Sequence, residues 1–232
     1  MNNIEEFRKI FKEFEDETKK KLKYKYDDLG ECINILSDKR WNPYFSERSF
    51  IQFCRKLRNI DSHNNNDKYY LITDDTILRL KNVLEEVKHP YKVYNKATTN
   101  IYSKNVNDLV LTTMKDMNDK SYTHIPIYED DNKTLAGIFS ENTLFQYVMN
   151  DKIIEIDENT TFNDIRKVID LKNSKEIIRF VSKEELYDKV VNEFIKEFKE
   201  NNKLACVLVT NSGSKNEKVM GIITAWDVIG RW

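Results

Sequence analysis

GIITAWDVIG, residues 221–230, is the stretch that decides how the second half of this chain is interpreted. It follows an apolar run and holds two of the chain's five glycines. Thr224 stands three residues before Asp227, which places a hydroxyl and a carboxylate where a strand gives way to a helix. Two interpretations fit. Thr224 can simply cap a helix whose first turn is favoured by Asp227, or the pair can hold the phosphate and sugar of a ligand.

The same pattern occurs earlier in the chain, since GIFS at 137–140 matches GIIT at 221–224. Each string ends a hairpin that follows an amphipathic helix, so the whole unit is duplicated. The expected segments are helices over 106–120 and 183–198, hairpins over 124–140 and 205–224, further helices from Glu141 and Ala225, and short strands near Ile101 and Phe180. Because neither copy can cover both faces of so small a sheet, we expect the two to pack against each other.

This duplicated unit resembles a tandem pair of CBS domains, a Bateman module, over about residues 97–232. The string glycine, hydrophobic, any residue, Ser or Thr, two residues, Asp resembles the family's adenosyl-ligand signature. The resemblance implies an α+β protein in which an N-terminal helical bundle precedes two α/β repeats packed as a pair. The corresponding domains are a helical domain (1–90), a first repeat (97–150), a connecting insertion (151–179) and a second repeat (180–232).

In that family the hydroxyl and the aspartate contact the phosphate and ribose of an adenosyl ligand. The resemblance therefore assigns a ligand site to Gly221, Ile222, Thr224 and Asp227, with Ser140, Ile125 and Pro126 contributing from the first copy. A carboxylate can accept hydrogen bonds from both ribose hydroxyls, and a glycine lets the backbone approach a ligand closely. The implied regulatory ligand is an adenine nucleotide (AMP, ADP or ATP) or a related adenosyl compound, with no other cofactor.

The two copies differ where that chemistry is concentrated. Thr143 stands in the first copy where Asp227 stands in the second, and a hydroxyl cannot hold two ribose hydroxyls as a carboxylate does. HIP (124–126) resembles the family's strand before the hairpin, and ACV (205–207) stands there in the second copy. We therefore expect one principal ribose-holding site per chain.

The first ninety residues have the periodicity of four helices. In the first of them, apolar residues recur at three- and four-residue steps, namely Ile4, Phe7, Ile10, Phe11 and Phe14. Ser46 is expected to cap the third helix and Thr73 the fourth, which His89 and Pro90 end.

The third of these helices carries Arg58, Asn59 and His63. This arginine, polar residue and histidine spacing resembles the signature of HEPN domains, helical bundles found in prokaryotic RNases and their inactive relatives. In catalytic members the two residues form a metal-independent RNA-cleaving site across a dimer interface, and imidazole and guanidinium chemistry suits that reaction. Continuous helix would rotate His63 about 140° away from Arg58, so either a helix end near Asp61 or a partner chain is needed. The alternative is structural, with His63 favoured near a helix C-terminus.

Composition narrows the classes of function. The chain has 38 basic and 39 acidic residues and a formal net charge of -1. This balance does not indicate binding of the whole protein to nucleic acid or to a membrane. No apolar stretch has the length of a membrane span, and the charged N-terminus does not read as a signal peptide. Three cysteines without a close pair favour a reduced, cytoplasmic protein, and three histidines give no zinc pattern.

The expected protein is thus a cytoplasmic homodimer in which an adenosyl ligand at the repeat pair controls a helical effector domain. That effector is an RNase of the HEPN type or, alternatively, a non-enzymatic module that binds protein or RNA or only dimerises. A third interpretation is an assembly scaffold with both signatures degenerate.

Overall fold

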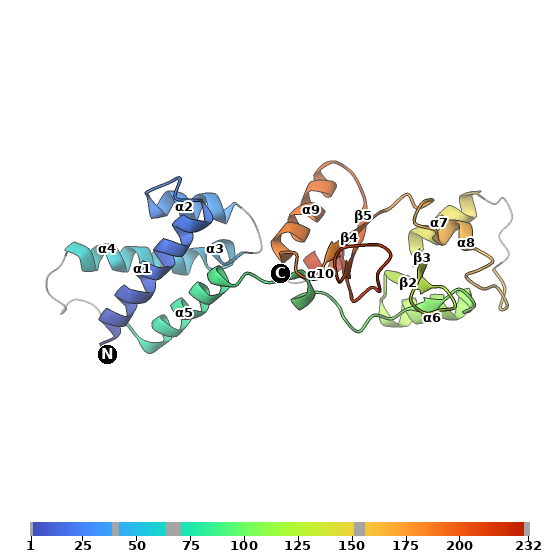
Figure 1. The fold of residues 1–232 in the computed structure, drawn as a ribbon, viewed down its shortest axis with the longest axis horizontal. Coiled ribbons are helices and arrows are strands. Elements are labelled where there is room, and N and C mark those ends of the chain that lie inside the picture. Colours follow the sequence, from blue (N-terminus) through green and yellow to red (C-terminus); the bar gives the residue numbers. More distant parts are fainter. Residues whose placement is uncertain (1, 39–41, 64–70, 151–155, 230–232) are drawn as a thin grey trace. The chain divides into compact units, whose positions relative to one another are not determined.

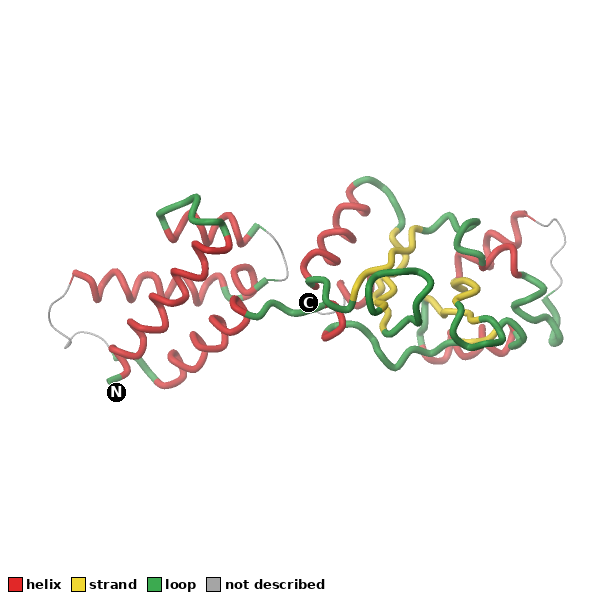
Figure 2. Tube along the Cα trace, in the orientation of Figure 1, coloured by secondary structure: helices red, strands yellow, loops and turns green. Residues whose placement is uncertain are grey.

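The computed structural model describes residues 2–38, 42–63, 71–150 and 156–229. The chain divides into two compact units, Met1–Tyr91 and Lys92–Trp232. In the described residues of the first unit the regular structure is helical, and the second unit combines helices with two small sheets (Figures 1 and 2).

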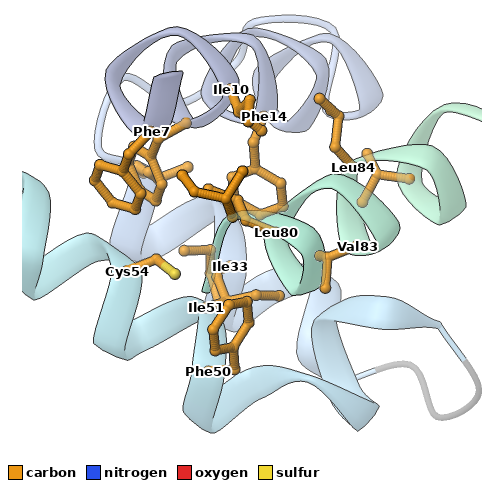
Figure 3. Packing of buried hydrophobic residues seen from close by; sticks show 14 of the residues in the cluster. Phe7, Ile10, Phe14, Ile33, Phe50, Ile51, Cys54, Leu80, Val83 and Leu84 are labelled. Carbon is orange, nitrogen blue, oxygen red and sulfur yellow. The ribbon is translucent and has the colours of Figure 1, made fainter. Parts of the chain in front are cut away.

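The first unit is a bundle built on amphipathic helices. Its helices are α1 (Asn3–Lys21), α2 (Leu29–Ser37), α3 (Pro43–Ser46), α4 (Arg48–His63) and α5 (Asp74–Lys88). The stripe of three phenylalanines on α1, Phe7, Phe11 and Phe14, is buried against residues of α2, α4 and α5, such as Ile33, Ile51 and Leu80 (Figure 3). This cluster is the core that the helical periodicity predicts.

The helix caps only partly follow the sequence expectation. Thr73 caps α5, because its hydroxyl accepts the N–H of Thr76 at 3.3 Å. The expected cap at Ser46 is wrong: Ser46 is the last residue of α3, and its hydroxyl donates to the carbonyl of Asn42. Pro43 suits the first turn of a helix, so the chain forms a separate short helix capped by Asn42 before α4 begins.

The second unit contains two sheets of the same topology. The elements of the first copy are β1 (Lys104–Asn105), α6 (Val110–Lys120), β2 (His124–Tyr128), β3 (Leu135–Ser140) and α7 (Glu141–Asn150). The second copy has β4 (Ile177–Ser182), α9 (Tyr187–Lys199), β5 (Leu204–Thr210), β6 (Gly221–Thr224) and α10 (Ala225–Ile229). In each, the first strand pairs in parallel with the second, which forms an antiparallel hairpin with the third. The remaining short helices are η1 (Val93–Asn95) and α8 (Arg166–Ile169).

Both long helices of this unit begin later than expected, α6 at Val110 and α9 at Tyr187. Before α6, the Asp108 carboxylate accepts the N–H of Asn105 at 2.7 Å, so these residues form a turn instead of helix. The first strand also lies at Lys104–Asn105, beyond the expected position near Ile101.

The two copies bury apolar side chains in a common cluster. Ile138 of β3 packs with Leu208 of β5 and Ile222 of β6. This confirms the expectation that the two small sheets cover each other.

Candidate functional site

Thr224 and Asp227 form a hydrogen-bonded corner between β6 and α10. The Asp227 Oδ2 atom accepts the backbone N–H of Thr224 at 2.8 Å and its hydroxyl at 3.0 Å. This arrangement is compatible with both sequence interpretations. The carboxylate accepts hydrogen bonds from Thr224 where the helix begins, and its Oδ1 atom can still accept a hydrogen bond from a ligand.

The first copy has the same corner with a hydroxyl in the place of the carboxylate. The N–H of Ser140 donates to Thr143 Oγ1 at 3.1 Å, and the two hydroxyl oxygens also lie 3.1 Å apart. Ser140 and Thr143 are both buried. The duplication thus preserves the geometry of the corner while its charge is lost.

A carboxylate reaches the first corner from elsewhere in the chain. Glu176, directly before β4, accepts the hydroxyl of Ser140 at 2.9 Å and a bond from Asn142. Its Oε2 atom lies 3.9 Å from His124 Nε2. Burial raises the pKa of Glu176, but the neighbouring His124 side chain and the hydrogen bonds from Ser140 and Asn142 outweigh this, so the pKa lies below its usual value. Sequence analysis missed this residue, because no local spacing connects it with Ser140.

A cleft of about 830 Å³ lies beside the Thr224–Asp227 corner. That volume is in the usual range for small-molecule sites. Its lining residues come from both copies and from the segment before β1: Thr98, Met114, Met117, Asn118, Ser121, Tyr122, Thr123, His124, Glu141, Leu144, Ile222, Thr224, Trp226 and Asp227. The cleft therefore brings the candidate corner together with residues more than a hundred positions away.

The residues assigned to the site by sequence do not all reach this cleft. Ile222 lines it along with the corner, whereas the buried β2 residues Ile125 and Pro126 are not among its lining residues. The β2 residue that lines it is His124, whose side chain is 13% exposed. Strand register also corrects the alignment of the copies. His124 pairs with Ser140 as Cys206 pairs with Thr224, so HIP corresponds to CVL (206–208) and not to ACV.

The glycines of both strings lie where another chain segment crosses. A Cβ on Gly221 would lie 2.8 Å from the Cβ of Ala97, and next to it Thr98 and Ile222 exchange two backbone hydrogen bonds of 3.0 Å. A Cβ on Gly137 would lie 2.0 Å from the carbonyl oxygen of Ile169. The lack of a side chain at Gly221 therefore makes room for the neighbouring segment at Ala97 and Thr98. This is a second role, in addition to the close approach of a ligand that the sequence suggests.

In the helical unit, Arg58 belongs to an ion-pair network. Its guanidinium donates to Glu15 Oε2 at 2.9 Å and to Asn59 Oδ1 at 3.3 Å, and Lys19 pairs with the same glutamate at 2.9 Å. Burial of Glu15 raises its pKa, but the bonds from Lys19 and Arg58 outweigh this and lower it. Arg58 and Asn59 of α4 are thus in contact. Arg58 also links α4 to α1 through its ion pair with Glu15.

His63 is the last residue of α4, and its side chain lies outside the described part of the structure. The helix continues through Asp61 to His63, so the first of the two conditions, a helix end near Asp61, is not met. The rotation of about 140° between Arg58 and His63 therefore applies. Within one chain, α4 does not place the two residues on one face.

The three cysteines lie in the interior of the units that contain them. Cys32, Cys54 and Cys206 are free and buried, and burial raises the pKa of the Cys54 thiol to about 12. No group of three or more His, Cys, Asp or Glu side chains in the described ranges is placed to hold a metal ion. None of the described helices combines the length and apolar character that crossing a lipid bilayer requires.

Comparisons with known proteins address the second unit. Residues 97–150 match the family model of the CBS domain. No curated protein matches the chain. Similar solved structures include a protein assigned to acetoin utilization (AcuB) from Vibrio cholerae, with 20% identity, a TM-score of 0.45, and coverage of 61% of this chain and 89% of that one.

Two further solved structures are similar over different lengths. The CBS domain pair of protein MJ0100, solved with 5′-methylthioadenosine and S-adenosyl-L-methionine, has 19% identity, a TM-score of 0.42, and coverage of 60% of this chain and 93% of that one. A conserved protein domain from Neisseria meningitidis has 16% identity, a TM-score of 0.44, and coverage of 79% and 99%. The family match rests on the sequence of the first copy, and the chain therefore contains a CBS domain at residues 97–150.

Proposed function

We propose that residues 180–232 form a second CBS repeat, and that the pair is a regulatory module for an adenosyl ligand. The observation that carries this proposal is the Thr224–Asp227 corner beside a cleft of ligand size, lined from both copies. The matched family and the topology shared by the two sheets support it. Asp227 would accept hydrogen bonds from the ribose hydroxyls, and Trp226 would offer a flat surface to the base.

Ligand-induced stabilisation tests this module directly. The melting temperature of the full chain is measured with AMP, ADP, ATP, S-adenosylmethionine and cyclic di-AMP, for wild type and Asp227→Ala. A ligand at about 100 times its Kd stabilises a protein by about 2.7 kcal/mol, which is a shift of several degrees. We expect such a shift for at least one compound, and its loss in Asp227→Ala. Asp130→Ala, on the exposed β2–β3 turn, is the matched control.

No shift with any compound would contradict the module. A shift that persists in Asp227→Ala would contradict the assignment of the ribose to that residue while leaving the module in place.

We propose further that the helical unit is the effector, acting as a dimer, and that the ligand changes how two such units meet. Such regulation requires the ligand to bind the two arrangements with different affinity. One form of this effector is a HEPN-type RNase with Arg58, Asn59 and His63 in its site. What supports it is the sequence spacing and the contact between Arg58 and Asn59.

The RNase is separated from its alternative, a protein- or RNA-binding module, by cleavage assays with and without the ligand. The RNase predicts cleavage that is lost in His63→Ala. RNA binding without cleavage in either state of the ligand favours the binding module, and cleavage that is unchanged in His63→Ala removes the proposed catalytic role.

A further inference from the structure

The cleft beside the Thr224–Asp227 corner is lined with negative charge. Its ionisable lining side chains are Glu141, Asp227, His124 and Tyr122. Among the residues that the structure describes, no lysine or arginine lines it. The charged groups that a ligand would meet along the described lining are therefore the two carboxylates.

The corner itself offers acceptors and few donors. The N–H and the hydroxyl of Thr224 both donate to Asp227 Oδ2, so neither proton is left for a ligand. Ile222 likewise donates its N–H to the carbonyl of Thr98. Apart from the N–H groups of the first turn of α10, what remains at the corner is the Oδ1 atom of Asp227 and the lone pairs of oxygen atoms, which bind ligand O–H and N–H groups.

The parts of an adenosyl ligand differ in how favourably they interact with these groups of the cleft. A ribose has hydroxyl donors for Asp227, and an ammonium or sulfonium group is attracted by a carboxylate. A phosphate monoester brings about two negative charges at pH 7 and needs donors or cations around its oxygens. Set beside Glu141 and Asp227, it meets repulsion that no lysine or arginine among the described lining residues offsets.

Building on the adenosyl site proposed above, we propose that this cleft selects adenosyl compounds without a phosphate, neutral or cationic, over AMP, ADP and ATP. Asp227 holds the ribose, and Glu141 is the specificity-determining residue that disfavours anionic substituents. Glu141 opens α7 in the first copy, so the selectivity of a corner in one copy is set by the other.

Binding to the full chain is measured by calorimetry with adenosine, S-adenosylmethionine, AMP and ATP at one ionic strength. Adenosine and S-adenosylmethionine are expected to bind at least tenfold more tightly than AMP, and AMP more tightly than ATP. Higher salt should narrow these ratios, because it screens the repulsion. AMP binding as tight as that of adenosine would overturn the inference.

Substitution at Glu141 makes the test specific to this residue. Glu141→Gln should narrow the ratio between the affinities for adenosine and AMP several-fold, and Glu141→Lys should reverse it. Glu184→Lys repeats the change of charge at an exposed position outside the cleft lining, and should leave the ratio unaltered. An unchanged ratio in Glu141→Lys overturns the role of Glu141, and equal helix content of the two variants by circular dichroism excludes unfolding as the cause.

The outcomes separate this inference from the proposed function. Binding of none of the four compounds would overturn the adenosyl site itself, and the inference with it. Tight binding of AMP or ATP would leave that site in place and overturn only the selectivity.

Discussion

Glu176 contacts the corner of the first copy, and no sequence motif predicts this contact. It lies 36 residues beyond Ser140, whose hydroxyl it accepts, and only the fold brings the two together. The sequence shows that Thr143 lacks a carboxylate, and from this alone the first corner reads as uncharged. Because the added carboxylate is already bonded to Ser140, that hydroxyl is engaged within the chain, which agrees with one principal ligand site per chain.

Replacing Glu176 by Gln should destabilise the second unit at neutral pH. The variant keeps the size of the side chain but replaces a charge-assisted hydrogen bond, and bonds to charged groups contribute about 1.5–3 kcal/mol. We expect a lower melting temperature and a loss of about 1 kcal/mol or more in the free energy of unfolding by urea. Glu184→Gln, at an exposed carboxylate, is the control and should change neither.

The same residue predicts a pH dependence of known sign. The pKa of Glu176 is lower in the folded chain than its ordinary value of 4.5. Its contribution is therefore fully present above that value, and is lost as the pH falls through the lowered folded-state pKa. Between neutral pH and about pH 3, the stability difference between wild type and Glu176→Gln should shrink. A difference that stays constant would show that the charge of Glu176 does not stabilise the fold.

At the scale of elements, apolar periodicity predicts the helices well and their starts poorly. The core face of α1 follows directly from the spacing of its phenylalanines, since every third or fourth residue meets the same neighbours. The start of α6 depends instead on one hydrogen bond that Asp108 accepts from the N–H of Asn105, and that of α4 on a short helix that begins at Pro43. Such local competition between turn and helix has no periodic signal.

The crossings at Gly137 and Gly221 give a prediction about element packing. In Gly137→Ala the new methyl would meet the backbone carbonyl of Ile169 at 2.0 Å, which cannot move alone. In Gly221→Ala it would meet the Ala97 methyl at 2.8 Å. Overpacking costs about 1–3 kcal/mol, so Gly137→Ala should be the more destabilising of the two by urea unfolding.

Only the crossing at Gly221 can be relieved by a second substitution. Ala97→Gly combined with Gly221→Ala moves the methyl from one segment to the other and should recover most of the lost stability. Ala97→Gly should not rescue Gly137→Ala, which makes that pair the control. Failure of the double variant to recover would mean that Gly221 is needed for a reason other than the space taken by Ala97.

At the scale of the whole molecule, duplication is what pointed to the candidate corner. The repeated string singled out the corner and its counterpart in the first copy, and the expected packing of the copies agrees with a cleft lined by residues of both. The part of the lining from the first copy could not be foreseen, because Glu141 carries no motif of its own and the string HIP was expected to contribute Ile125 and Pro126 instead of His124. The part of Glu141 and His124 in the cleft follows only from the arrangement of the two copies.

The helical unit offers a surface for the proposed dimer, on α4. Phe53 and Ile60 are 48% and 45% exposed, and seven residues place them about 20° apart around the helix. Arg58 lies about 160° from Ile60 on the same helix, where it pairs with Glu15 of α1. A partner chain that covers the exposed apolar pair would thus leave Arg58 outside the interface.

Two models of the dimer then predict opposite results in analytical ultracentrifugation. If the apolar pair forms the interface, Phe53→Ser with Ile60→Ser should yield monomers, and Arg58→Ala should leave the dimer intact. If the composite RNase site forms the interface, Arg58→Ala should weaken the dimer and the double serine variant should not. Leu78→Ser, at an exposed residue of α5, controls for loss of surface hydrophobicity. Phe53 and Ile60 are already about half buried, so covering each contributes about half of the ~1.5–3 kcal/mol of a fully buried apolar side chain. Loss of both should therefore raise the dimer Kd about tenfold or more, a change that the measurement resolves.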